Sequence, residues 1–144
     1  AGWPRIDTMQ PEYNLMSRGV EADLAPLCVR EGISIIAYFA LASGYLTGKY
    51  RSEADKTKSV RGGGMDKYMR GTGPSVLAAM DMVRQSSGAS LAQIALAWLM
   101  ARPGVAAPIA SATSVHQLNE LMGALSLELS ADQIAALDAA SAQS

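Results

Sequence analysis

The sequence predicts an α/β fold built on parallel strands. Short runs of β-branched and apolar residues are each followed by segments whose apolar residues recur at helical spacing. The run at residues 33–38 is too short for a helix and too apolar for a half-exposed strand, which is typical of a strand covered on both faces. This alternation favours parallel strands joined by right-handed crossovers. A chain of 144 residues fits one domain.

The first half of the chain supplies two strands and one helix. The first strand is predicted at residues 6–9, and a helix follows over residues 23–31. Gly32 marks the end of this helix because glycine tolerates the left-handed backbone found just past helix ends. The apolar run at residues 33–38 forms the second strand.

The second half supplies one strand and four helices. Apolar residues within 76–83 mark one helix, and those within 91–99 recur at i, i+3, i+4, i+7 and i+8, which predicts a second helix with an apolar stripe. Residues 102–104, Arg-Pro-Gly, end it. The third strand is predicted at residues 106–110. A helix with the apolar face Leu118, Leu121, Met122 and Leu125 comes next, and a last helix carries Ile134 and Leu137.

Three parallel strands are too few for a closed structure. They leave two unpaired edges and too little sheet area to bury the faces of five helices, so the chain resembles part of a larger sheet. A complete eight-stranded α/β barrel takes about 200 to 250 residues. The chain therefore accounts for about three of eight βα units.

Composition excludes several classes of protein. No apolar run reaches the length of a membrane helix, and the one cysteine, Cys28, cannot form an internal disulfide. No secretory leader is apparent, so a cytoplasmic location is expected. Nucleic-acid binding is disfavoured by the net charge of −1. Metal-ligand spacing, a nucleophile elbow and a P-loop are all missing from the sequence.

Residues 49–70 are basic in an otherwise slightly acidic chain. They hold seven basic and three acidic residues, a local balance of +4, and include three consecutive glycines. Such a segment is either a mobile loop that embraces phosphates or a solvated linker, and composition alone favours the linker.

Three motifs follow the three predicted strands, where α/β proteins place ligands. They are Gln-Pro-Glu-Tyr-Asn at residues 10–14, Tyr-Phe-Ala-Leu-Ala-Ser-Gly-Tyr-Leu-Thr-Gly-Lys-Tyr at 38–50, and Pro-Ile-Ala-Ser-Ala-Thr-Ser-Val-His-Gln-Leu at 108–118. In this order and at these separations they resemble the NADP(H)-dependent aldo-keto reductases. The resemblance implies that residues 1–144 are a single partial domain, the C-terminal portion of a (β/α)8 TIM barrel with about three βα units and tail helices. Residues 49–73 would be a mobile basic loop within it.

The resemblance also implies a set of residues that bind NADP(H). Gln10 would hydrogen-bond the nicotinamide carboxamide, and Tyr38 would stack on the nicotinamide ring. On the residues alone, a strand-end glutamine bound to backbone and an ordinary core tyrosine remain open. Residues 39–44 would wrap the pyrophosphate with backbone N–H groups, Lys49 would supply a charge, and Arg61 would reach over the dinucleotide. The full set is Gln10, Tyr38, Phe39, Ala40, Leu41, Ser43, Gly44, Lys49, Arg61, Ser111, Thr113, Ser114, Gln117, Glu120 and Leu121.

The third motif has two readings. Ser114 and Gln117 have capping-box spacing, as do Ser90 with Gln93 and Ser130 with Gln133, so capping alone explains the pair. Only this copy directly follows a strand. A helix N-terminus with hydroxyl groups there suits the 2′-phosphate of NADP.

The sequence departs from the family pattern at three positions. Many members carry an arginine near Thr113 and an asparagine at the place of Leu121, and Phe39 replaces a small hydroxyl residue. These changes weaken the preference for NADP over NAD and remove one contact to the pyrophosphate.

The catalytic residues of the family come from earlier strands. By the resemblance, these are a tyrosine with lysine, aspartate and histidine, and none is carried over to this chain. His116, the one histidine, is expected on a solvated helix. The resemblance therefore implies that the chain is the cofactor-binding part of an oxidoreductase that reduces aldehydes or ketones with NADPH, and we expect it to be inactive by itself. The alternative is a noncatalytic NADP(H)-binding or assembly half-barrel. Expected partners are a small carbonyl substrate and the missing barrel half or a second copy.

Overall fold

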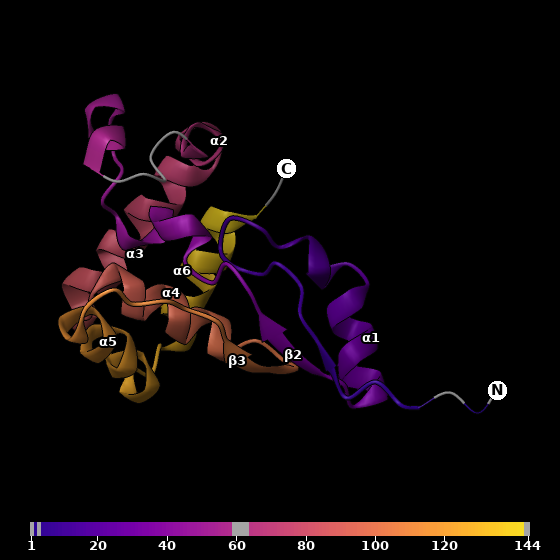
Figure 1. Ribbon diagram of the computed structural model, residues 1–144. Coiled ribbons are helices and arrows are strands. Elements are labelled where there is room, and N and C mark those ends of the chain that lie inside the picture. Colours follow the sequence, from indigo (N-terminus) through magenta and orange to yellow (C-terminus); the bar gives the residue numbers. More distant parts are fainter. Residues whose placement is uncertain (1, 3, 59–63, 143–144) are drawn as a thin grey trace.

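The computed structural model describes residues 2, 4–58 and 64–142. Its sheet has three parallel strands in the order β1 (Thr8–Met9), β2 (Ser34–Ala37) and β3 (Val105–Pro108). The helices are α1 (Leu24–Glu31), α2 (Asp66–Met69), α3 (Gly73–Ser87), α4 (Leu91–Met100), α5 (Val115–Met122) and α6 (Ala131–Ser141). Short 3-10 helices are η1 (Gly19–Glu21), η2 (Ala42–Thr47), η3 (Glu53–Lys58) and η5 (Gly123–Ser126). Figure 1 shows α1 beside one flank of the sheet and α3 to α6 grouped beside the other.

The order of strands and helices is as predicted except for α2, which lies in the segment predicted as a loop, and the strands are shorter. The strand predicted at residues 6–9 pairs only at Thr8 and Met9, and Ile6 is 58% exposed. The strands predicted at 33–38 and 106–110 are reduced to β2 and β3. An irregularity in register between Ile35 and Ile36 interrupts the pairing of β2 with β3. Apolar runs extend past the hydrogen-bonded residues because strand pairing needs a partner as well as suitable side chains.

The prediction that the second strand is covered on both faces is correct for one face only. Ile35 and Ala37 are fully buried, whereas Ser34 and Ile36 on the other face are half-buried. A three-stranded sheet offers that second face too few neighbouring side chains to cover it.

The helix α4 lies at the centre of the core. Its side chains Ile94, Trp98 and Leu99 are fully buried, and α3, α5 and η5 pack around it. The predicted capping boxes at Ser90 and Ser130 are confirmed, with each serine accepting from the N3 amide and each glutamine accepting from the cap amide. Gly32 ends α1 with φ +63°, also as predicted. Because nearly all of its side chains are apolar and buried, α4 is the helix against which the neighbouring elements pack.

The apolar face of α5 is not packed inward. Leu118 is 50% exposed, Met122 53% and Leu125 66%, and only Leu121 is half-buried among the residues predicted to form this face. The helical periodicity was a correct guide to the helix, but no layer of described residues lies over its apolar side. Such a row of exposed apolar side chains is a feature of a surface that another segment covers.

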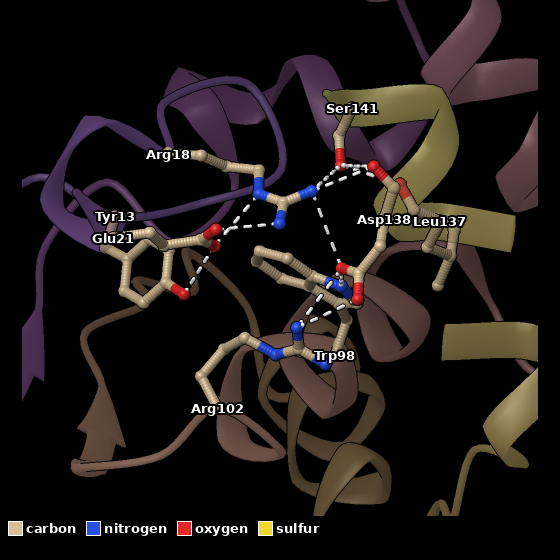
Figure 2. A network of polar contacts seen from close by, with 8 residues as sticks. All are labelled: Tyr13, Arg18, Glu21, Trp98, Arg102, Leu137, Asp138 and Ser141. Atoms are coloured by element: carbon tan, nitrogen blue, oxygen red, sulfur yellow. Dashed lines mark hydrogen bonds and ion pairs between the residues drawn. The ribbon is translucent and has the colours of Figure 1, made fainter. Parts of the chain in front are cut away.

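A network of polar contacts attaches α6 to the segment that follows β1 (Figure 2). Arg18 forms an ion pair with Glu21 at 2.7 Å and donates to the carbonyl oxygen of Asp138 at 2.9 Å. Tyr13 donates to Glu21 at 2.7 Å. Burial opposes ionisation of Glu21, but the hydrogen bonds from Arg18 and Tyr13 outweigh it and hold the pKa of this carboxyl below its ordinary value.

Within residues 2, 4–58 and 64–142, every helix is too short or too polar to cross a membrane. The same residues contain no group of three or more histidine, cysteine, aspartate or glutamate side chains placed to hold a metal ion.

Candidate functional site: a pocket at the ends of two strands

An open pocket of about 840 Å³ lies where β2 and β3 end. One wall is the segment after β2, and the other is the segment from the end of β3 into α5. The two segments are held together at their start, where the Ile109 amide donates to the Ala37 carbonyl oxygen at 2.7 Å. Because parallel strands end at the same edge of the sheet, two segments about seventy residues apart form one site.

The wall after β2 has an uncommon backbone. Phe39, Ala42 and Ser43 have φ values of +52°, +48° and +56°, which side chains other than glycine rarely adopt, and Gly44 has φ +94°. The carbonyl oxygen of Leu41 accepts from the amides of Gly44 and Leu46, which closes the turn. Consecutive turns of this kind form concavities lined by N–H groups, which bind anions.

Backbone N–H groups in this wall remain available. Among the described residues, the amides of Ala40 and Leu41 donate to no protein acceptor, and both residues line the pocket. The amide of Ala42, by contrast, donates to the Phe39 carbonyl oxygen at 2.7 Å. Free backbone donors beside an open pocket can receive a phosphate or another anion.

Lys49 brings a positive charge to the same wall. Its ammonium lies 5.0 Å from the centroid of the Tyr50 ring, which is fully buried and holds the lysine in place. A Cβ atom at Gly44 would lie 3.3 Å from Lys49 Cε. Only glycine therefore combines φ +94° with this close approach of the lysine side chain.

The aromatic residues after β2 face the pocket instead of the core. Tyr38 is 38% exposed and Phe39 51%, and their rings meet edge to face with centroids 5.1 Å apart. Tyr13, a true core tyrosine, is 2% exposed. The reading of Tyr38 as an ordinary core residue is therefore wrong, and a flat aromatic face is available to a ligand.

The wall at α5 is polar. The Ser114 hydroxyl accepts from the Gln117 amide at 3.2 Å, but the Gln117 side chain does not return to the Ser114 amide. It accepts instead from the amide and hydroxyl of Thr113, at 2.8 and 3.0 Å. The predicted capping box is thus only half formed here, unlike those of α4 and α6. The Gln117 side chain therefore bonds to the residue before the cap, whereas Gln93 and Gln133 bond to the cap amide itself.

The structure brings most of the predicted site residues together. Twelve of them line the pocket: Tyr38, Phe39, Ala40, Leu41, Ser43, Gly44, Lys49, Ser111, Thr113, Gln117, Glu120 and Leu121. Gln10 is exposed at the end of β1 and Ser114 caps α5, and neither borders the pocket. Arg61, with residues 59–63, lies outside the described residues.

Four residues that line the pocket were absent from the prediction: Thr47, Ala92, Ile109 and Ala110. Thr47 lies within the second motif, where its hydroxyl donates to the Gly44 carbonyl oxygen at 2.8 Å. Ile109 and Ala110 directly follow β3, so the strand-end rule could have found them. Ala92 comes from the first turn of α4, and no local sequence signal points to it.

The segment after Lys49 is not without secondary structure. It contains η3 and α2, and Lys56 bridges them through ion pairs with Glu53 and Asp66. Arg51 pairs with Asp81 of α3 at 2.7 Å. These contacts anchor both sides of residues 59–63 to the body of the chain, and the expected mobility of residues 49–73 stays a prediction.

Among the described residues, the titratable side chains that line the pocket are Glu120, Lys49 and Tyr38. His116, the one histidine of the sequence, is exposed on α5. Burial raises the pKa of the Tyr45 hydroxyl, which makes this tyrosine a poorer proton donor than in water. The arrangement is suited to binding an anion with an aromatic part.

Comparison with known proteins places this geometry in a family. The family model described as Aldo/keto reductase family matches residues 1–142. Protein tas of Escherichia coli (strain K12) is 37% identical over 140 residues, which cover 94% of this chain and 40% of that protein. Aldo-keto reductase AMT2 of Alternaria alternata is 27% identical over 136 residues, 94% of this chain and 36% of that protein.

A solved structure agrees with these relatives. The crystal structure of the thermostable aldo-keto reductase Tm1743 in complex with the inhibitor epalrestat matches with a TM-score of 0.68 and 26% identity. The match covers 92% of this chain and 39% of that one. The chain thus spans about two fifths of the length of the relatives it matches. Together with three parallel strands that carry a pocket at their ends, the match over residues 1–142 shows that the chain belongs to the aldo/keto reductase family.

Proposed function

We propose that this chain is the NADP(H)-binding part of an oxidoreductase that reduces aldehydes or ketones with NADPH. The single observation that carries this proposal is the pocket formed jointly by the segments after β2 and β3. It combines an exposed aromatic face, free backbone donors and a lysine along one wall, with hydroxyl and amide groups along the other. A dinucleotide presents an aromatic ring, a pyrophosphate and a ribose phosphate, and so matches these groups in kind.

Each wall has its own task in this proposal. Tyr38 packs on the nicotinamide, and Gln10 reaches the carboxamide from the end of β1. The amides of Ala40 and Leu41 and the ammonium of Lys49 receive the pyrophosphate. Thr113 and Ser114, with Gln117, receive the ribose phosphate at the start of α5. When bound, NADPH supplies a hydride to the carbonyl carbon, and the residues of this chain hold and orient it.

We also propose that the chain alone does not reduce carbonyl compounds and that residues 1–144 form one partial barrel domain in the cytoplasm. In the described part of the chain, β1 and β3 are the edges of the sheet. Further strands of a complete barrel would pair with these edges and would carry the proton donor. The exposed apolar row on α5 would be covered by the same added part of the barrel.

The experiment is a fluorescence titration of the purified chain with NADPH. We expect saturable binding that Lys49→Ala and Ser114→Ala each weaken by about threefold to tenfold, the effect of one lost polar contact. Unchanged affinity in both variants would reject the assignment of these residues, and absence of binding by the wild-type chain would reject the proposal.

A second candidate function is a noncatalytic NADP(H)-binding or assembly module. The exposed apolar row on α5 and the two open sheet edges favour it, because they are surfaces for another polypeptide. Assays with NADPH and simple aldehydes separate the candidates once the barrel is complete. Turnover supports the reductase, whereas tight binding without turnover supports the module.

A further inference from the structure

Asn14 is one of two polar residues that are fully buried in the described part of the chain. It is 1% exposed, as is Ser141. Its backbone forms a two-way bridge with Ser17, at 3.2 and 3.0 Å, and its side-chain oxygen accepts from the Met16 amide at 2.8 Å. The amide side chain is therefore held at one end by its own turn. A buried amide group needs partners at both ends.

The other end of Asn14 reaches the wall of the pocket. Its Nδ2 donates to the carbonyl oxygen of Phe39 at 3.0 Å, across 25 positions of sequence. The same oxygen accepts from the Ala42 amide. Phe39 is the first of the left-handed residues after β2, with φ +52°. A conformation of this kind persists only where surrounding contacts over-determine it.

The contact from Asn14 is a side-chain restraint on this turn that comes from a segment distant in sequence. The other hydrogen bonds given for the turn come from the amides of Ala42, Gly44 and Leu46 and from the Thr47 hydroxyl, all within residues 42–47. Without an external restraint, the peptide between Phe39 and Ala40 can rotate toward the common backbone region. That rotation would turn the free amide of Ala40 away from the pocket.

We propose that Asn14 is a positioning residue, which holds the turn at residues 39–44 in the conformation that receives the pyrophosphate. Asn14 does not line the pocket, so it acts through Phe39 and not through contact with the ligand. This inference rests on the proposed function and extends it to a residue with no place in the predicted site.

The test compares two substitutions and two ligands. Asn14→Asp keeps the shape but places a carboxylate oxygen against the Phe39 carbonyl oxygen, so we expect NADPH affinity to fall by about tenfold or more. Asn14→Ala removes the restraint without repulsion, and we expect a smaller loss, about threefold. Adenosine 2′-phosphate reaches only the α5 wall, so its affinity should stay within about twofold in both variants.

Ser141→Ala is the matched control. Ser141 is equally buried and accepts from Arg18, but it lies in α6 away from the pocket. We expect it to lower the free energy of unfolding and to leave NADPH affinity within about twofold. If Asn14→Asp fails to fold, the comparison of Asn14→Ala with Ser141→Ala decides the question.

The outcomes separate the inference from the function on which it rests. Folded Asn14 variants with wild-type NADPH affinity would overturn the inference alone. Equal loss of both ligands would also overturn it, because it would indicate a general effect on folding. If the wild-type chain binds neither adenosine 2′-phosphate nor NADPH, the proposed function is overturned instead.

Discussion

The carboxylate of Asp138 accepts a hydrogen bond from the indole Nε1 of Trp98 at 2.8 Å. Arg102 donates to both oxygens of the same carboxylate at 3.1 Å, and Arg18 lies 3.5 Å away. Both guanidinium groups also lie over the Trp98 ring, at 4.8 and 5.5 Å from its centroid. One carboxylate on α6 thus pairs with two largely buried arginines around a buried tryptophan, and Arg18 pairs with Glu21 as well (Figure 2).

Removal of this carboxylate should destabilise the chain strongly. Asp138→Ala removes the carboxylate that pairs with Arg102, whose side chain is 14% exposed, and leaves Arg18, 16% exposed, paired with Glu21 alone. We expect the free energy of unfolding to fall by about 2 to 3 kcal/mol, near the lower end for a buried pair because Asp138 is partly exposed. Denaturant unfolding measures it, and Trp3→Phe as background makes the fluorescence report Trp98. Asp138→Asn, which keeps an acceptor for the indole, should cost less.

Glu21 should make the chain acid-sensitive. Its pKa is below the ordinary value in the folded chain, and an unfolded glutamate titrates near about 4.3. Between these two pKa values the unfolded chain binds a proton that the folded chain does not. The stabilisation is therefore complete above about pH 4.3 and is lost as pH falls through the folded pKa.

Unfolding of Glu21→Gln across pH checks this. The variant should be less stable at neutral pH and should lose less stability than the wild type between neutral pH and about pH 3. Glu128→Gln, at an exposed position before α6, is the control and should follow the wild-type curve. Parallel curves for Glu21→Gln and the wild type would contradict the prediction.

Gly73 should not tolerate any side chain. A Cβ atom there would lie 1.7 Å from the Tyr68 carbonyl oxygen and 2.6 Å from the Tyr45 hydroxyl. Since backbone must move to relieve this clash, we expect Gly73→Ala to lower the free energy of unfolding by about 1 to 3 kcal/mol. Gly19→Ala, with open space around its Cβ position, should change it little, as thermal unfolding of both variants would show.

The α5 wall should be open to a gain of cofactor selectivity. Thr113 lines the pocket, and Glu120 is the charged side chain among the described residues that line the same wall. Under the proposed function, Thr113→Arg adds a charge-assisted contact to the 2′-phosphate and should raise the preference for NADPH over NADH by about tenfold. Titration with both cofactors measures the ratio. An equal gain for both would show that the new charge acts on the shared pyrophosphate.

The sequence predicted the order of elements because periodicity and caps are local. Gly32 and the boxes at Ser90 and Ser130 fix helix ends within a few residues, and the structure has them in place. The motifs also selected most of the pocket lining. Local signals failed where a distant partner decides the outcome. Pairing with β2 limits β1 to two residues, and the Gln117 side chain accepts from Thr113 instead of from the cap amide.

Asn14 illustrates the same limit within the site. It belongs to the first motif, yet its role depends on the carbonyl oxygen of Phe39 and on the left-handed φ value of that residue. A phenylalanine does not predict a left-handed φ value. Likewise, the helical spacing of Leu118 and Met122 predicts an apolar face but not whether another layer covers it. Such properties arise from tertiary contacts and become visible only in the folded chain.

The short length of β1 affects where the chain opens locally. A strand joined to its neighbour at only Thr8 and Met9 has few bonds to break before its amides meet water. Deuterium from heavy water should therefore enter there first and reach the amides of α4 last, because that helix is enclosed on nearly all sides. Opening would begin at the strand that precedes Gln10 and leave the turn after β2 closed.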